Sequence, residues 1–135
     1  MAKLIKFTSS IPMGMRIYTH GVEVIVPTNR YRIAKKFANR RNRRIYLQRE
    51  SDNKNDSGAI KVMAKSKGWF LEARKCIGYV PADIVNTLVT TGMEDKVKAR
   101  LQLIAIEDRD TINIRFDLLG PMDDYEEYSS IYFRG

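Results

Sequence analysis

Six short segments that read as β-strands, several of them with alternating apolar and polar residues, lie between Gly21 and Gly120 and constrain the fold more than any other feature of this sequence. Alternation with a period of two is typical of a half-buried β-strand. Turn-forming residues or short helical segments separate the six runs. The predicted strands are GVEVIVP (21–27), RRIYLQRE (43–50), AIKVMAK (59–65), KCIGYV (75–80), KVKARLQLIAIE (96–107) and TINIRFDLLG (111–120).

Two helices are predicted between these strands. The first follows Thr28 or Asn29, either of which can cap a helix, and its apolar residues recur at helical spacing at Ile33, Ala34, Phe37 and Ala38. The second is PADIVNTLVTTG (81–92), with proline in its first turn and glycine at its end. Because short antiparallel strands must close or cover their edges, we expect a mainly β fold with two short helices, either a small barrel or a strongly bent sheet.

A chain of 135 residues is long enough for a single domain. We expect residues 1–21 to be an N-terminal extension or edge strand, residues 22–120 to form the domain, and residues 121–135 to be an acidic, tyrosine-rich C-terminal tail. Two interpretations of the tail, which contains MDDYEEY, stay open. It is either a solvated tail or an acidic strip that folds back onto basic residues elsewhere.

Several classes of protein are excluded by composition. No apolar run approaches the roughly 20 residues that cross a bilayer, and the N-terminus lacks the apolar core of a secretory signal. One cysteine and one histidine cannot form a disulfide or a zinc site of several ligands. The phosphate-binding loop of nucleotide-driven motors is also absent from the sequence. We therefore expect a cytoplasmic protein with no cofactor, no metal and no enzymatic activity.

The positive charge of the chain is concentrated in one segment. The formal net charge is +8, and the segment from Asn29 to Glu50 alone contains nine basic residues and one acidic residue. Arginine outnumbers lysine there by seven to two, and a guanidinium group pairs with phosphate in a bidentate geometry. The segment predicts a phosphate-binding ridge, with a merely solvated helix face as the alternative. The candidate ridge residues are Arg30, Lys36, Arg40, Arg41, Arg43, Arg44 and Arg49.

The loop in RESDNKNDSGAIKV (49–62) is rich in Asp and Asn. Its spacing from Asn53 begins like a calcium-binding EF-hand, but Ala64 stands at the twelfth position, where a bidentate Glu is required. Calcium is therefore not expected. The loop side chains either cap their own backbone or also hold a ligand.

The stretches LQRESDNKNDSGAIKV and IGYVPADIV resemble the two sequence motifs of the HIRAN domain, and the order of predicted elements over residues 22–120 is similar to that family. The resemblance implies a small OB-like six-stranded β-barrel with two helices. Members of the family occur at the N-terminus of fork-remodelling helicases and as stand-alone bacterial and phage proteins. In the helicase-borne members the domain holds single-stranded DNA, and an Asp accepts a hydrogen bond from the 3′ hydroxyl. The resemblance places that role on Asp56, with Asn53 before it and Tyr79 as a pocket side chain.

The sequence departs from the DNA-binding members at aromatic positions. Asn55 stands where they have a stacking aromatic side chain, and Asp110 falls near another such position. Since a stacked base contributes about 1–3 kcal/mol, capture of strand ends is predicted to be weaker here than in those members. Asn53, Asn55, Asp56 and Tyr79 remain the candidate residues of a secondary pocket.

These observations lead to a functional hypothesis with two alternatives. The hypothesis is a non-enzymatic module that binds nucleic acid, with DNA favoured, as single strands or strand ends, through the basic ridge and the Asn/Asp loop. The first alternative is a protein-binding adaptor, of a type that phages encode, which docks its basic surface on an acidic or DNA-binding partner. The second is an end-processing nuclease, for which Asp52 and Asp56 are the only close carboxylate pair in the loop.

Overall fold

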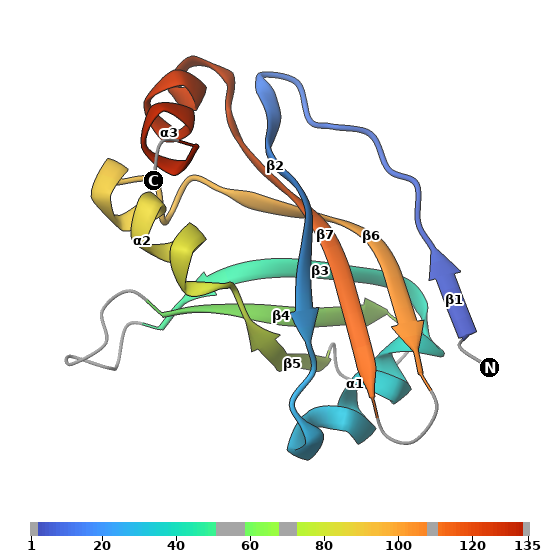
Figure 1. Ribbon diagram of the computed structural model, residues 1–135. Coiled ribbons are helices and arrows are strands. Elements are labelled where there is room, and N and C mark those ends of the chain that lie inside the picture. The colour runs from blue at the N-terminus through green and yellow to red at the C-terminus, as the bar shows by residue number, and fades with distance from the viewer. Residues whose placement is uncertain (1–2, 51–58, 68–72, 108–110, 134–135) are drawn as a thin grey trace.

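The computed structural model, which describes residues 3–50, 59–67, 73–107 and 111–133, consists of two antiparallel sheets and three short α-helices (Figure 1). The first sheet has the strand order β1-β6-β7-β2 and the second has the order β3-β4-β5. The strands are β1 (Lys3–Lys6), β2 (Met15–Ile25), β3 (Arg41–Arg49), β4 (Ile60–Lys67), β5 (Ala73–Tyr79), β6 (Lys98–Ile106) and β7 (Ile112–Pro121). The helices are η1 (Thr28–Arg30), α1 (Tyr31–Ala38), α2 (Ala82–Thr91), η2 (Met122–Asp124) and α3 (Tyr125–Tyr132), of which η1 and η2 are single 3-10 turns.

The hydrophobic core contains side chains from both sheets. Ile104 and Phe116 of the first sheet and Val62 and Ile77 of the second are completely buried. Burying each such side chain stabilises the fold by about 1.5–3 kcal/mol. At Gly78 an added Cβ would lie 2.5 Å from the Val24 side chain, so the glycine permits the close approach of β5 to β2. The two sheets therefore share one core.

A closed six-stranded barrel is not confirmed. Seven strands are described, and they divide into two hydrogen-bonded sheets. The strands β3 and β6 contact each other but belong to different sheets. The physical reason is the pairing of β6. The edge of β6 that faces away from β7 pairs with β1 over Leu103 to Ile106. Next to this pairing, the Phe7 amide donates a hydrogen bond to the Gln102 carbonyl at 2.8 Å. Those β6 backbone groups are thus not available to β3.

The N-terminal residues take part in the first sheet. The strand β2 begins at Met15, before the predicted start at Gly21, and it pairs with β7 from Met15 to Ile25. Its register shifts twice between Ile17 and Val22, and this irregularity interrupts the alternation that a sequence pattern can detect. The short strand β1 lies at the edge of the first sheet, next to β6.

The acidic C-terminal residues form a helix, and this corrects both interpretations of the tail. Tyr128 of α3 is completely buried, and its hydroxyl lies 2.7 Å from the Thr19 hydroxyl on β2. Its ring also packs 4.8 Å from that of Tyr18, centroid to centroid. The helix α3 contacts α2 and β2, and Figure 1 shows both helices at the opposite end of the molecule from α1.

No helix in the described ranges is long and apolar enough to cross a membrane, and the longest, α2, has ten residues.

Candidate nucleic-acid interface

The helix α1 presents a basic face to solvent. Ala34, Phe37 and Ala38 are buried beneath it, because apolar residues three and four positions apart lie on the same side of a helix. The opposite side of the helix is exposed and carries Arg32, Lys35 and Lys36, and Arg40, two residues after the helix, is exposed too. The helix itself contains no acidic residue.

The strand β5 adds a lysine beside this helix. Lys75 is exposed, and together with Ile33, Lys36 and Arg40 it lines a shallow groove of about 380 Å³ between α1 and β5. In the sequence, Lys75 lies 35 positions after Arg40 and outside the basic segment. Charge patterning along the chain therefore missed this residue, and only the packing of α1 against β5 reveals it.

The second sheet turns one face toward the core and the other toward solvent. Ile45, Val62 and Ala64 are buried in the core, so their neighbours along each strand point outward. Register places Arg44 opposite Lys65, Tyr46 opposite Met63, and Gln48 opposite Lys61 on that outward side. On the next strand Cys76 lies opposite Met63, and Tyr79 lies opposite Lys61. We call these eight residues, of which Met63 is buried between its neighbours, the outer face of the second sheet.

The outer face combines cations with two tyrosines. Arg44 is exposed, Lys61 and Lys65 are half-buried, and Tyr79 has 46% of its surface exposed. Tyr46 is half-buried near the middle of the same face. Aromatic rings with flanking cations are the side chains that bind single-stranded nucleic acid without strict sequence preference. Lys61 and Lys65 lie outside the basic segment, so the pattern of charge along the chain did not predict them either.

Arg30, Arg43 and Arg49, among other predicted ridge residues, have partners within the protein. Arg49 forms ion pairs with Glu94 at 3.4 Å and Asp95 at 3.7 Å. The Arg43 guanidinium donates to the Ala38 carbonyl at the end of α1 and lies 4.8 Å from the centre of the Phe7 ring. Arg30 donates to the Cys76 carbonyl at 3.4 Å. These contacts connect elements of the fold, and the predicted phosphate contacts of these three residues stay predictions.

The structure brings the remaining candidates together only in part. Lys36 and Arg40 share the groove beside α1, whereas Arg44 lies on the outer face. Arg41 is the first residue of β3 and follows α1 closely in the chain. Asn53, Asn55 and Asp56 fall outside the described residues. Tyr79 pairs with Lys61 near the start of β4, and so it lies at the end of the sheet where the loop joins β3 to β4.

Charge is strongly segregated in this half of the molecule. The strands β3, β4 and β5 contain nine Lys or Arg residues, α1 contains three more, and none of the four elements contains Asp or Glu. A surface of one sign raises the local concentration of counter-ions of the other sign and accelerates their association. We use the name basic surface for three parts taken together. They are the exposed residues of α1, the two residues Arg40 and Lys75, and the outer face of the second sheet.

The described fold and the basic surface define a class: a small two-sheet β protein with one cationic sheet. No protein-family model matches the chain, and no curated protein sequence matches it. Among solved structures, the crystal structure of the HIRAN domain of human HLTF is similar, with a TM-score of 0.49 and 15% identity, over 90% of this chain and 92% of that chain. The membership of the HIRAN family that the two sequence motifs suggest stays a prediction.

Proposed function

We propose that this protein binds nucleic acid, DNA in the first place, through the basic surface and without catalysing a reaction. One observation supports the proposal above others: the twelve cations of α1 and the second sheet occur there without a single acidic residue. Lys and Arg that contact phosphates release condensed counter-ions, and this release is the main source of sequence-independent affinity for nucleic acid.

The test compares two variants of equal charge. In the first, Lys36, Arg44 and Lys75 of the basic surface are replaced by Ala. In the control, the exposed Lys3, Lys6 and Lys96, which lie outside that surface, are replaced by Ala. Affinity is measured by fluorescence anisotropy with two DNA strands of unrelated sequence and with their duplexes, at several salt concentrations.

We expect the first variant to bind both sequences more weakly by a similar factor. Its plot of log affinity against log salt should be less steep, by about 0.7 per lost phosphate contact for single strands and about 0.9 for duplexes. The control should bind like the wild type. Equal losses in both variants would mean that net charge alone attracts DNA, and absence of binding by the wild type would refute the proposed function.

Recognition of strand ends by Asn53, Asn55, Asp56 and Tyr79 is a finer proposal. It rests on the sequence resemblance, and a comparison of strands that end in a 3′ hydroxyl or a 3′ phosphate tests it. Wild-type protein that binds both ends equally would refute it.

The adaptor alternative uses the same basic surface. An acidic polypeptide without phosphate, such as polyglutamate, is its simplest probe. If polyglutamate bound more tightly than DNA at equal salt, the acidic-protein partner would be favoured over nucleic acid.

A further inference from the structure

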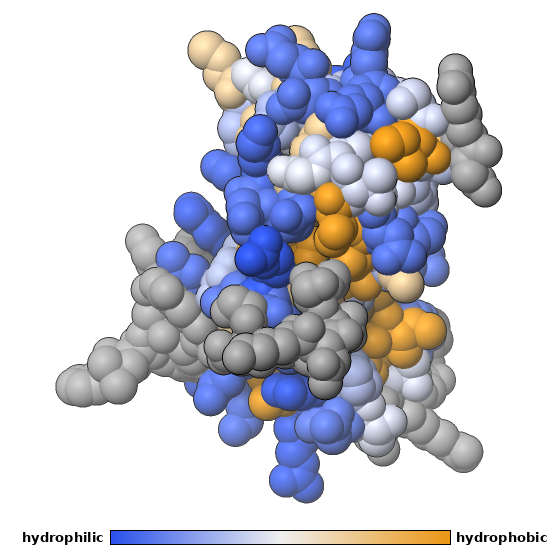
Figure 2. All heavy atoms as spheres, turned by 90° about the vertical axis from the view of Figure 1, so that its left-hand side faces the viewer, coloured by the Kyte–Doolittle hydropathy of each residue, from blue (hydrophilic) through white to orange (hydrophobic). Residues whose placement is uncertain are grey.

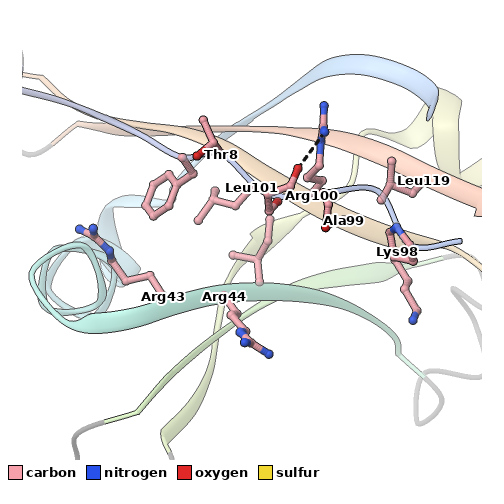
Figure 3. A pocket seen from close by; sticks show the side chains of 13 residues that line it. Thr8, Arg43, Arg44, Lys98, Ala99, Arg100, Leu101 and Leu119 are labelled. Carbon is pink, nitrogen blue, oxygen red and sulfur yellow. Dashed lines mark hydrogen bonds between the residues drawn. The ribbon is translucent and has the colours of Figure 1, made fainter. Parts of the chain in front are cut away.

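A pocket of about 320 Å³ opens between the two sheets, where β3 and β6 lie side by side without belonging to one sheet (Figure 3). Its walls come from β3, from the first residues of β6, from Leu119 of β7 and from the segment 7–12 that links β1 to β2. The volume lies near the lower end of the range of roughly 300–1,000 Å³ that is usual for small-molecule sites. The pocket is therefore large enough for one small organic group.

The floor and the rim of this pocket differ in chemistry. Ile45, Leu101 and Leu119 are at least 90% buried and make the floor apolar, together with the half-buried Ala99. The rim carries the exposed Lys98 and the exposed hydroxyl residues of the segment 8–10. A flat apolar group would bury its faces on the floor, and an attached anion would meet the rim.

Arg100 holds one wall of the pocket in place. Its guanidinium donates to the Asp117 carboxylate at 2.8 and 3.3 Å and to the Ser9 carbonyl at 3.0 Å, and this last bond is visible in Figure 3. The segment 7–12 is thus tied to β6 and β7 without a ligand. Since such pre-organisation lowers the entropy that is lost on binding, the wall is suited to a ligand site.

Lys98 is a cation at this rim that has no partner among the described residues. Within the described part of the chain its side chain forms no ion pair or hydrogen bond, whereas Arg43 and Arg100 both have partners. Figure 3 shows Lys98 extending from β6 in the direction of β3, while Arg44 projects from β3 away from β6. Arg44 belongs to the outer face, so the basic surface reaches the edge of the pocket.

We propose that the pocket accepts one unpaired nucleotide of a single strand whose backbone lies on the basic surface. The base packs on the apolar floor, and the adjacent phosphate meets Lys98 and the rim hydroxyls. This inference rests on the proposed function and adds a preference for single strands. A duplex would first have to expose a base, at a cost of a few kcal/mol.

The test fills the pocket and removes its cation in separate variants. Ala99→Leu places a larger side chain in the pocket, and Lys98→Ala removes the rim charge. Ala82→Leu, at an exposed site on α2, and Lys96→Ala, at an exposed site outside the pocket, are the matched controls. The probes are a short DNA strand, its duplex, and the same strand with abasic sites, all measured by fluorescence anisotropy at one salt concentration.

We expect the wild type to prefer the single strand over both other probes. Ala99→Leu should weaken single-strand binding by about tenfold, or about 1.4 kcal/mol, and leave duplex binding unchanged. Lys98→Ala should weaken single-strand binding by a smaller factor, and both controls should bind like the wild type. Thermal melting of each variant checks that it is folded.

Different failures have different meanings. If the wild type bound intact strand, abasic strand and duplex equally, the pocket proposal would be overturned while the proposed function stood. The same conclusion would follow if both pocket variants were folded and bound every probe like the wild type. If the wild type bound none of the probes, both proposals would be overturned.

Discussion

The buried carboxylate of Asp117 is the residue on which the geometry beside the pocket depends. It is completely buried, and it accepts hydrogen bonds from Arg100, from the Gln102 amide at 2.7 Å and from the Gly21 backbone amide at 3.0 Å. A buried charge is tolerated when it is paired and fully hydrogen-bonded. Asp117 therefore connects the start of β6, the middle of β7 and the bend in β2.

Removal of this carboxylate should be costly. Asp117→Ala leaves Arg100 without its ion pair, and we expect the free energy of unfolding to fall by about 3 kcal/mol. The control is Asp95→Ala, because Asp95 is exposed and pairs with Arg49 only at 3.7 Å, so its loss should cost less than about 1 kcal/mol. Urea denaturation followed by circular dichroism measures both. Similar, small losses in the two variants would contradict the structural role of Asp117.

At the scale of elements, α3 is held to the fold by a group of tyrosines. The Tyr18 hydroxyl of β2 donates to the Pro121 carbonyl at 2.6 Å, and its ring lies 5.5 Å from that of Tyr125. The Tyr132 hydroxyl donates to the Asp83 carboxylate of α2 at 3.1 Å. Burial raises the pKa of Tyr18 to about 12, with a further contribution from the nearby Asp124 carboxylate. Burial also raises the pKa values of Tyr128 and Tyr132.

These raised pKa values predict a loss of stability in alkali. An unfolded tyrosine ionises near pH 10, whereas folded Tyr18 keeps its proton until about pH 12, so deprotonation favours the unfolded chain between those values. The free energy of unfolding should therefore be fully retained below pH 10 and fall as the pH rises toward 12. Tyr18→Phe should be about 1 kcal/mol less stable at pH 8, but should lose less stability than the wild type between pH 10 and 12. Urea titrations at several pH values provide the measurement, and parallel pH profiles would contradict the assignment.

At the scale of the whole molecule, acidic and basic residues are concentrated in different elements. The elements α2, η2 and α3 contain five Asp or Glu residues and no Lys or Arg, whereas α1 and the second sheet contain only cations among their charged residues. Figure 2 shows the side that carries α2 and α3, where hydrophilic side chains predominate and hydrophobic ones form smaller patches between them. Such a separation orients the protein as it approaches a polyanion, with the basic surface first.

The division into two sheets has its own consequence for backbone dynamics. The strand β4 has a neighbour on both sides, whereas β3 pairs only with β4, so alternate β3 amides lack a partner across the sheet. We expect native-state hydrogen exchange, followed by NMR, to show strong protection along β4 and alternating protection along β3. Uniform protection of every β3 amide would indicate a closed barrel in solution and contradict this arrangement.

Much of the secondary structure could be predicted from local patterns. The alternation in TINIRFDLLG predicted a strand at 111–120, close to β7, and PADIVNTLVTTG predicted the helix that became α2. For the site, the sequence identified the basic segment that supplies α1 and β3. The helix α3 was missed although the signals were present: four carboxylates at its N-terminal end suit a helix dipole, and Tyr125, Tyr128 and Tyr132 recur at helical spacing.

The sequence by itself indicated where most of the strands and the helix α2 run and where positive charge is dense along the chain, because both depend on neighbours a few positions away. Only the tertiary structure decided how the strands divide between two sheets. That division depends on the pairing of β1 with the edge of β6 that faces away from β7. Only the tertiary structure brought Lys75 beside α1, and Lys98 to the pocket that adjoins β3. A binding surface made from several strands is a property of their pairing, and pairing joins residues that local sequence patterns cannot relate.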